Sequence, residues 1–358
     1  MTLHIFNPEH DIALANGMRQ VTPPHAARQL RNDLGFIPAF WAKEGDVVLV
    51  EDTEQAKYYY KRICQNVARL FGVKTNNVIF ADADTIHTLS FDDVAPWGWD
   101  YSIYSKVQKI ANTVEKIPSR DDIERTMELS HRRTAAKLLP KLRTLPGTIG
   151  EMVELDDISL VAEQVAQQNG KAVLKAPWSS SGRGVRFITS SIDDSTTRWI
   201  SNTFTKQHSI MMEPLYRRVA DLGMEFQSHG DGTASYLGLS LFSTTNGAYT
   251  GNVIATETRK RELISRYIDC NLIDNIKDIV CSQDFSLLTS RYKGAFGIDM
   301  MVVNGEYNNG FLLHPCVEIN LRRTMGHLAL CLTPADDGIE GIMQVVFEGK
   351  FKLRISKQ

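Results

Sequence analysis

A strand that runs into a loop of small residues is the first feature with chemical potential. Residues 172–177 (Ala-Val-Leu-Lys-Ala-Pro) have the pattern of a buried strand, and residues 178–185 (Trp-Ser-Ser-Ser-Gly-Arg-Gly-Val) follow directly. Backbone N–H groups in such a loop can approach phosphate oxygens, and Lys175 supplies a positive charge for the same anion. The segment predicts a phosphate-binding loop, although a flexible hairpin tip would have the same composition.

A second candidate is the alternating segment 314–322 (His-Pro-Cys-Val-Glu-Ile-Asn-Leu-Arg). Because side chains alternate between the two faces of a strand, Glu318, Asn320 and Arg322 should share one face. Carboxylate and amide oxygens suit a hard cation such as Mg²⁺, and the guanidinium can bind a phosphoryl group. An exposed strand face carrying a surface ion pair is the alternative interpretation.

Asp299 is the one acidic residue in an otherwise apolar strand pattern at residues 295–303. An unpaired buried carboxylate is costly, so Asp299 needs a cation, a hydrogen-bond partner or an edge position. A metal ion that bridges Asp299 and Glu318 would supply that cation.

The elements that must position these residues follow from the apolar pattern. Short apolar runs at 3–6, 37–40, 47–50 and 78–81 alternate with helical patterns, which predicts βα units around a mainly parallel sheet. The helix that follows Val50 has capping-box spacing at Asp52 and Gln55. Further helices are expected at 120–142 and 157–169. A hairpin turn is expected at residues 246–247 (Asn-Gly), between strands at 235–245 and 252–256.

Composition excludes several classes of protein. The 358 residues are enough for two to three domains or subdomains, and 43% hydrophobic with 23% charged residues is ordinary globular usage. A formal net charge of -2 gives no basic field for nucleic acid. The five cysteines include no C-x-x-C pair, and the polar start and the lack of a long apolar run argue against secretion and a membrane span. We therefore expect a cytoplasmic protein without nucleic-acid or membrane partners.

Several common motifs are absent from the sequence. It contains no G-x-x-x-x-G-K-[ST], G-x-G-x-x-G, H-E-x-x-H or G-x-S-x-G. Walker-type nucleotidases, simple Rossmann dehydrogenases, zinc proteases and ordinary α/β hydrolases are thereby disfavoured.

Taken in order, the motifs resemble the ATP-grasp superfamily. The segments that carry the resemblance are Arg132-Arg133 with Lys137, Leu174-Lys175 with residues 179–184, and residues 211–215, 297–299 and 318–322. The loop at 179–184 is most similar to that of the formate-dependent phosphoribosylglycinamide formyltransferase branch. The sequence departs from the usual pattern by an arginine at the first basic position, by Leu321 where proline is common, and by Asp299 where that branch more often has glutamate.

The resemblance implies a fold and a domain plan. The fold class is α/β (α+β): an ATP-grasp fold preceded by a parallel α/β pre-ATP-grasp domain. Residues 1–128 would form that first domain, residues 129–215 the small lid subdomain with the phosphate loop, and residues 216–358 the large subdomain with the metal site.

The resemblance also implies roles for individual residues. Glu213 to Leu215 would form the adenine hinge, and Glu225, or alternatively Asp221, would bind the ribose. The residues placed around ATP are Arg133 (or Arg132), Lys175, Ser180, Ser181, Gly182, Gly184, Glu213, Pro214, Leu215 and Glu225. Asp299, Glu318 and Asn320 would hold Mg²⁺, with Mn²⁺ as the alternative metal. Arg322 and Lys175 would act on the transferred phosphoryl group.

The implied activity is an ATP- and Mg²⁺-dependent, ADP-forming ligase. Such an enzyme joins a small-molecule carboxylate to an amine or thiol through an acyl phosphate. A kinase-like phosphotransferase and a catalytically inactive nucleotide-binding protein are the alternatives, and a homodimer is left open. A transition-metal site at His314, Cys316 and Glu318 is disfavoured because Pro315 interrupts the strand.

The acceptor site is not determined by the sequence. Residues 7–11 (Asn-Pro-Glu-His-Asp) follow the first strand, where open α/β sheets often bind ligands. His10 or Asn16 could therefore contact a substrate. Alternatively, Asn7 caps a helix that has Pro8 at its first position.

Overall fold

The computed structural model describes residues 1–17, 22–110, 114, 117–179, 184–245, 248–305 and 310–358. Its first region is a four-stranded parallel sheet in the order β3-β2-β1-β4. The strands are β1 (Thr2–Ile5), β2 (Val47–Leu49), β3 (Ile79–Ala81) and β4 (Asp93–Pro96), and the helices are α1 (His10–Asn16), α2 (His25–Leu34), α3 (Thr53–Phe71) and α4 (Tyr101–Ile110). From β1 the sheet is built outward through β2 to β3, and the chain then returns to place β4 on the other side of β1. The loops that follow β1 and β4 therefore lie next to each other at one edge of the sheet.

Local signals in this region are confirmed for α3. The Asp52 side chain accepts a hydrogen bond from the Gln55 N–H, and Gly72 ends the helix in the left-handed conformation with a φ of 70°. Tyr60 is buried on the apolar stripe, whereas Tyr58 is exposed.

Two local predictions in this region are wrong. Residues 37–40 form a 3-10 helix, η1 (Ile37–Phe40), and not a strand, because Pro38 has a fixed φ and no N–H for a sheet ladder. Helix α1 begins at His10 with Glu9 at the N-cap, so neither Asn7 nor Pro8 has the predicted capping position. Asn7 instead donates from Nδ2 to the Gly98 carbonyl (2.8 Å) and to Asp100 Oδ2 (3.0 Å).

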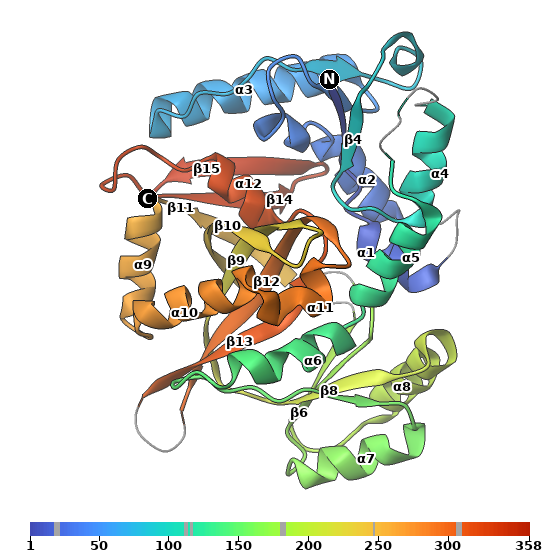
Figure 1. The fold of residues 1–358 in the computed structure, drawn as a ribbon, viewed down its shortest axis with the longest axis vertical. Helices are drawn as coiled ribbons and strands as arrows, with labels where there is room; N and C mark the ends of the chain where they lie inside the picture. Colours follow the sequence, from blue (N-terminus) through green and yellow to red (C-terminus); the bar gives the residue numbers. More distant parts are fainter. Residues whose placement is uncertain (18–21, 111–113, 115–116, 180–183, 246–247, 306–309) are drawn as a thin grey trace.

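The second region is a four-stranded antiparallel sheet in the order β5-β8-β6-β7. Its strands are β5 (Val153–Leu155), β6 (Ala172–Lys175), β7 (Val185–Ile188) and β8 (Ile210–Pro214), and it packs against α7 (Ile158–Gln167) and α8 (Asp194–Gln207) (Figure 1). Strands β6 and β7 flank the predicted phosphate loop. The loop therefore leaves the sheet directly after Lys175.

The third region is a seven-stranded antiparallel sheet in the order β13-β12-β9-β10-β11-β14-β15. The strands are β9 (Arg218–His229), β10 (Ala234–Thr245), β11 (Ala248–Ile254), β12 (Lys293–Asn304), β13 (Phe311–Asn320), β14 (Gly341–Phe347) and β15 (Phe351–Lys357). Its helices are α9 (Glu257–Ser265), α10 (Cys270–Cys281), α11 (Ser286–Thr289) and α12 (Met325–Cys331). The predicted hairpin is present, because Thr245 pairs with Ala248, although residues 246–247 lie outside the described ranges.

The cores cross the predicted domain boundaries. Helix α5 (Arg120–Leu129) leads into α6 (Arg133–Leu142), and the buried leucines of α6 join the core of the large sheet and not that of the second region. A second core joins the first region to the end of the chain through Phe6, Phe36, Val67, Trp97, Ile254, Leu328, Met343 and Leu353. The first and third regions therefore share apolar contacts, and α6 packs against β13 of the large sheet (Figure 1).

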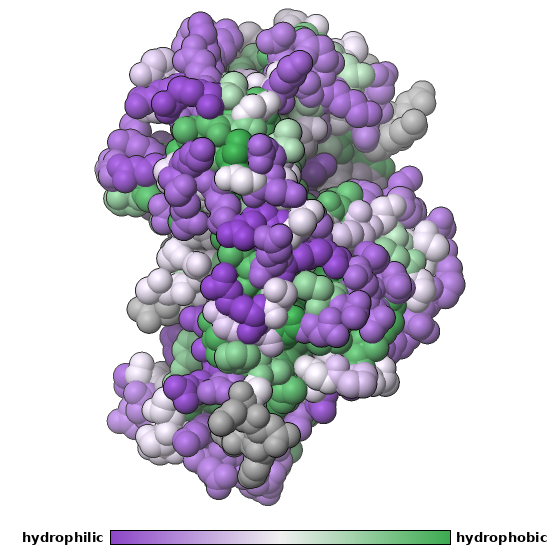
Figure 2. All heavy atoms as spheres, turned by 90° about the vertical axis from the view of Figure 1, so that its left-hand side faces the viewer, coloured by the Kyte–Doolittle hydropathy of each residue, from purple (hydrophilic) through white to green (hydrophobic). Residues whose placement is uncertain are grey.

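The surface agrees with the globular composition. On the face drawn in Figure 2, hydrophobic residues gather in separate patches bordered by hydrophilic ones. None of the helices in the described part of the chain combines the length and hydropathy needed to cross a bilayer. The homodimer stays a prediction.

Candidate active site

The three predicted metal ligands lie together on neighbouring strands. Asp299 on β12 is directly opposite Glu318 on β13. Asn320 donates from Nδ2 to Asp299 Oδ2 at 3.1 Å, and Arg322 donates from Nη2 to Asn320 Oδ1 at 2.9 Å. The alternation read from the sequence thus gives one polar surface at the end of β13. A bulge separates it from His314, which pairs with Met301.

This surface brings carboxyl groups together in a partly buried place. Burial, followed by the nearby carboxylates of Glu318 and Glu225, raises the pKa of Asp299 to about 8. Without a cation, Asp299 therefore holds a proton at neutral pH. A divalent cation would neutralise these carboxylates, so the donor set fits Mg²⁺.

The cation would not be enclosed by protein ligands alone. Among the described residues, no group of three or more His, Cys, Asp or Glu side chains could hold a metal ion. Asn320, phosphate oxygens and water would have to complete the coordination, which is how Mg²⁺ is commonly held beside nucleotides.

Lys175 lies at the end of β6, as predicted, and is paired with Glu213 on β8. The Lys175 Nζ to Glu213 Oε1 distance is 2.5 Å, and both side chains are more than nine-tenths buried. Burial raises the pKa of Glu213 despite this partner. The pairing of Glu213 with Lys175 was not foreseen from the sequence.

The other two residues predicted to form the adenine hinge, Pro214 and Leu215, lie at the end of β8. Leu215 donates its backbone N–H to the Lys171 carbonyl at 3.2 Å. Pro214 is the last residue of β8. The adenine contact predicted for Glu213, Pro214 and Leu215 therefore stays a prediction.

The geometry brings Arg132, and not Arg133, into the site. Arg132 donates to the Ala176 carbonyl, to Ser179 Oγ (2.9 Å) and to Glu318 Oε1 (2.6 Å), and its side chain is 5% exposed. Arg133 is 44% exposed and pairs with Glu154. Consecutive residues at a helix start point about 100° apart, so one of two adjacent arginines can enter the site while the other faces solvent.

We therefore expect Arg132→Gln and Arg133→Gln to behave differently. Removing the Arg132 charge should raise the apparent Kd for Mg·ATP by roughly tenfold or more, because a buried charge-assisted contact to phosphate is lost. Arg133→Gln should leave it within about twofold, as is usual for exposed pairs. Titration of ATP by calorimetry measures both, and equal effects of the two variants would contradict the assignment.

Only the base of the predicted phosphate loop lies within the described residues. The Ala176 N–H donates to the Gly184 carbonyl at 2.8 Å, and a Cβ on Gly184 would lie 2.1 Å from Ser179 Cβ. Glycine is therefore required at 184 for the loop to close at its base. Ser180, Ser181 and Gly182 lie outside the described residues, so their contacts stay predictions.

Glu225, the predicted ribose ligand, is buried, and its role stays a prediction. Its carboxylate faces Gly297 and Gly326, where an added Cβ would lie 2.6 and 1.9 Å away, and Oε2 is 2.9 Å from His327 Nδ1. It also contributes to the raised pKa of Asp299. Asp221, with Arg218 and Thr244 as partners, is closer to the surface.

His314 and Cys316 are buried beneath this site. A Cβ on Gly150 would lie 2.7 Å from His314 Nε2, and the Tyr216 ring lies edge-on at 5.8 Å. Burial, with Lys175 second, lowers the pKa of His314 to about 3. No metal-binding cluster of His, Cys, Asp and Glu is found here among the described residues.

An aspartate from the first region, Asp11, enters the site, and no pattern in the sequence indicates its partner. Asp11 accepts from Arg322 Nε (3.0 Å) and Nη2 (2.8 Å). Burial opposes ionisation of Asp11, but the Arg322 guanidinium outweighs it and lowers the pKa. Arg323 next in sequence donates its N–H to the Trp97 carbonyl (2.8 Å) and lies over the Trp41 ring. The end of β13 is thus attached to the first region.

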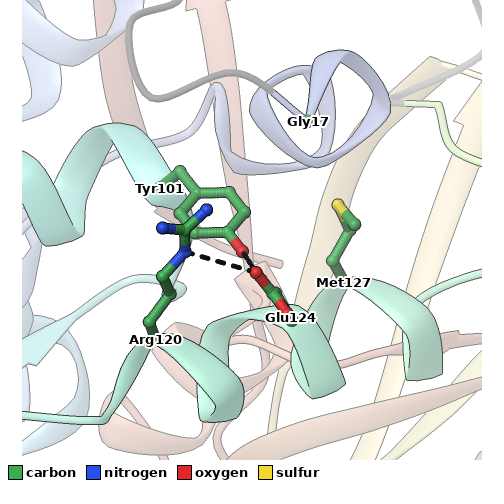
Figure 3. A pocket seen from close by; sticks show the side chains of 5 residues that line it. All are labelled: Gly17, Tyr101, Arg120, Glu124 and Met127. Carbon is green, nitrogen blue, oxygen red and sulfur yellow. Dashed lines mark hydrogen bonds and ion pairs between the residues drawn. The ribbon is translucent and has the colours of Figure 1, made fainter.

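A separate cavity of about 410 Å³ opens beside the end of α1. It is lined by Gly17, Tyr101, Arg120, Glu124 and Met127 (Figure 3). The Tyr101 hydroxyl donates to Glu124 Oε1 at 2.6 Å, and Arg120 Nε is 3.3 Å from the same oxygen. These polar groups therefore satisfy one another.

With this geometry in place, comparison with solved structures identifies the fold. N5-carboxyaminoimidazole synthetase from Staphylococcus aureus, complexed with ADP, has a TM-score of 0.50 at 11% identity, over 97% of this chain and 82% of that one. A biotin carboxylase complex with β-γ-ATP from Campylobacter jejuni has a TM-score of 0.51 at 12% identity, over 96% and 75%. An Archaeoglobus fulgidus protein described as an ATP-grasp superfamily member has a TM-score of 0.46 at 12% identity, over 100% and 99%.

The fold is that of the ATP-grasp superfamily, with an N-terminal parallel α/β region before it. This confirms the predicted fold class, and the resemblance to the ATP-grasp superfamily holds at the level of the fold. No protein-family model and no curated protein sequence matches the chain. The finer resemblance to the formyltransferase branch is not confirmed.

Proposed function

We propose that the chain is an ATP- and Mg²⁺-dependent, ADP-forming ligase that joins a small carboxylate to an amine or thiol through an acyl phosphate. The observation that carries the proposal is the Asp299–Glu318 pair on adjacent strands, with one arginine bound to Glu318 and a second linked to Asp299 through an amide. Arg132 contacts Glu318, and Arg322 contacts Asn320, which in turn contacts Asp299. Two fold relatives were crystallised with ADP or an ATP analogue, and this supports nucleotide binding here.

The roles of the site residues follow from their charge: cationic side chains would bind phosphate, and side-chain oxygens would bind the metal. Lys175 and Arg132 would bind phosphate oxygens at the mouth of the loop, and Arg322 would stabilise charge on the transferring phosphoryl group. Asp299, Glu318 and Asn320 would hold the metal, which when bound would neutralise phosphate charge. The chemistry needs no protein nucleophile, because the substrate carboxylate attacks the γ-phosphate.

The ion pairs of the free protein must be exchanged when nucleotide binds. Arg132 is paired with Glu318, and Lys175 with Glu213. Phosphate oxygens would pair with Arg132 and Lys175, and the metal would bind Glu318. Each ligand would therefore displace an ion-pair partner that opposes binding of the other ligand. ATP and Mg²⁺ should therefore bind with positive coupling, which for linked sites is typically about 1–3 kcal/mol. ATP titrations at increasing Mg²⁺ concentration measure it, after correction for Mg·ATP formation in solution. Independent binding would contradict the exchange.

The function is tested by thermal-shift and ADP-release assays with ATP and Mg²⁺. Formate, bicarbonate and amino acids serve as carboxylates, each with and without an amine, and Asp299→Asn serves as the inactive control. ADP that forms only when both substrates are present supports the ligase. ADP and a phosphorylated product from one acceptor alone would favour the kinase-like alternative. Stabilisation without turnover would favour a nucleotide-binding protein, and no response to Mg·ATP would overturn the proposal.

A further inference from the structure

The contact between Asp11 and Arg322 joins two regions that are 311 residues apart in sequence. Asp11 is the second residue of α1, and Arg322 lies just beyond β13. The carboxylate accepts from Nε and Nη2 together, and both side chains are less than one-fifth exposed. A planar guanidinium held by two parallel bonds has a fixed orientation, which a single contact would not give.

Asp11 is itself fixed by the edge where β1 and β4 end. The Asn7 side-chain amide donates to the Gly98 carbonyl and to Asp100 Oδ2. Asp100 Oδ1 in turn accepts the Ile103 N–H at the start of α4. His10, next to Asp11, is 1% exposed, and its Nδ1 is 3.5 Å from Asp100 Oδ2. Gly98 admits the His10 ring, because a Cβ there would lie 2.7 Å from it. The start of α1 therefore has little freedom to move.

On its other side, Arg322 is held by contacts with the end of β13 and the residue that follows it. Nη2 donates to Asn320 Oδ1 at 2.9 Å, and Nη1 donates to the Arg323 carbonyl at 3.1 Å. Asp11 thus completes a set of contacts that points the guanidinium towards the Asp299 and Asn320 surface. In the described part of the chain, the side-chain hydrogen bonds of Asp11 go to Arg322.

We propose that Asp11 is a positioning residue: the first region delivers its carboxylate to orient Arg322 for phosphoryl transfer. The inference rests on the proposed function. Asp11 acts through Arg322, so its loss should slow the chemical step and leave nucleotide affinity nearly unchanged.

The test compares Asp11→Asn, Arg322→Gln and the double variant with wild type. Phosphate release from Mg·ATP is measured alone and with bicarbonate, formate or an amino acid, and Mg·ATP affinity is measured by calorimetry. Asp11→Asn should lower kcat by roughly 10–100-fold with KM for ATP within about twofold. In the Arg322→Gln background it should have no further effect, because residues that act as a unit are not additive. Asp84→Asn, an exposed aspartate of the same region, is the control.

Asp11→Glu is a second variant that distinguishes loss of positioning from a folding defect. It keeps the charge with a shifted position, so it should fold as wild type and have an intermediate kcat. A wild-type rate in Asp11→Asn, or additive losses in the double variant, would overturn the positioning role alone. A wild type that neither binds nor turns over Mg·ATP would overturn the proposed function, and the positioning role with it.

Discussion

Asp299→Asn should abolish Mg²⁺-dependent nucleotide turnover while leaving the metal-free protein at least as stable as wild type. Loss of a charged metal ligand should lower kcat by roughly 100-fold or more, as losing one preorganised electrostatic contact commonly does. The metal-free protein should tolerate the change because Asp299, with a pKa of about 8, is already protonated at neutral pH. Asparagine reproduces that neutral state. Thermal unfolding with and without Mg·ATP, together with ADP release, measures both effects.

The same residue gives wild type a pH dependence of defined sign. The pKa of Asp299 is about 8 in the folded protein, against 3.8 ordinarily, so the folded state binds the extra proton between these values. Its contribution to stability is therefore lost as pH rises from about 4 to 8, by up to about 1.4 kcal/mol per pH unit. Asp299→Asn should remove this slope. Exposed Glu163→Gln is the control, and an unchanged slope in Asp299→Asn would contradict the assignment.

Lys175→Met should weaken ATP binding by at least tenfold and also destabilise the fold. The affinity falls because the phosphate loses a charge at the end of β6. The fold weakens because Glu213 is left buried without its partner, and breaking a buried ion pair in this way costs about 3–5 kcal/mol. Calorimetric titration of ATP and denaturant unfolding measure the two effects separately.

The double variant Lys175→Met/Glu213→Gln separates stability from binding. With both charges removed, most of the lost stability should return, because replacing a whole buried pair is often nearly neutral. ATP affinity should stay low. Lys171→Ala, at an exposed lysine just before the same strand, should bind ATP normally. Full ATP affinity in the double variant would remove Lys175 from the phosphate site.

Several features were predictable because their determinants are local. The Asp52 cap needs only a residue three positions later, and the alternation at 318–322 needs only the period of a strand. Lys175 is the last residue of a buried strand and precedes a loop of small residues, so its position at the strand end was predictable from the sequence. The prediction failed at residues 37–40, where an apolar run satisfied the strand pattern although Pro38 opposed it.

The neighbours across the site were decided by the tertiary structure. The sequence could not choose between Arg132 and Arg133, because the choice depends on the angle at which α6 leaves α5. Glu213 had the pattern of a hinge residue, yet its side chain meets Lys175 through the β6–β8 pairing. Asp11 and Arg322 are brought together by the packing of the first region on the large sheet.

The division has a physical reason. Helix caps and strand faces depend on residues a few positions apart, so the sequence by itself determined the ATP-grasp motifs and the polar face of β13. Ion pairs between distant segments form only when burial of apolar surface fixes the elements against one another. Here the core that includes Phe6 of the first region and Leu353 of the large sheet does this. A carboxylate such as Asp11 has no local pattern that names its partner. Its role is therefore visible only in the folded chain.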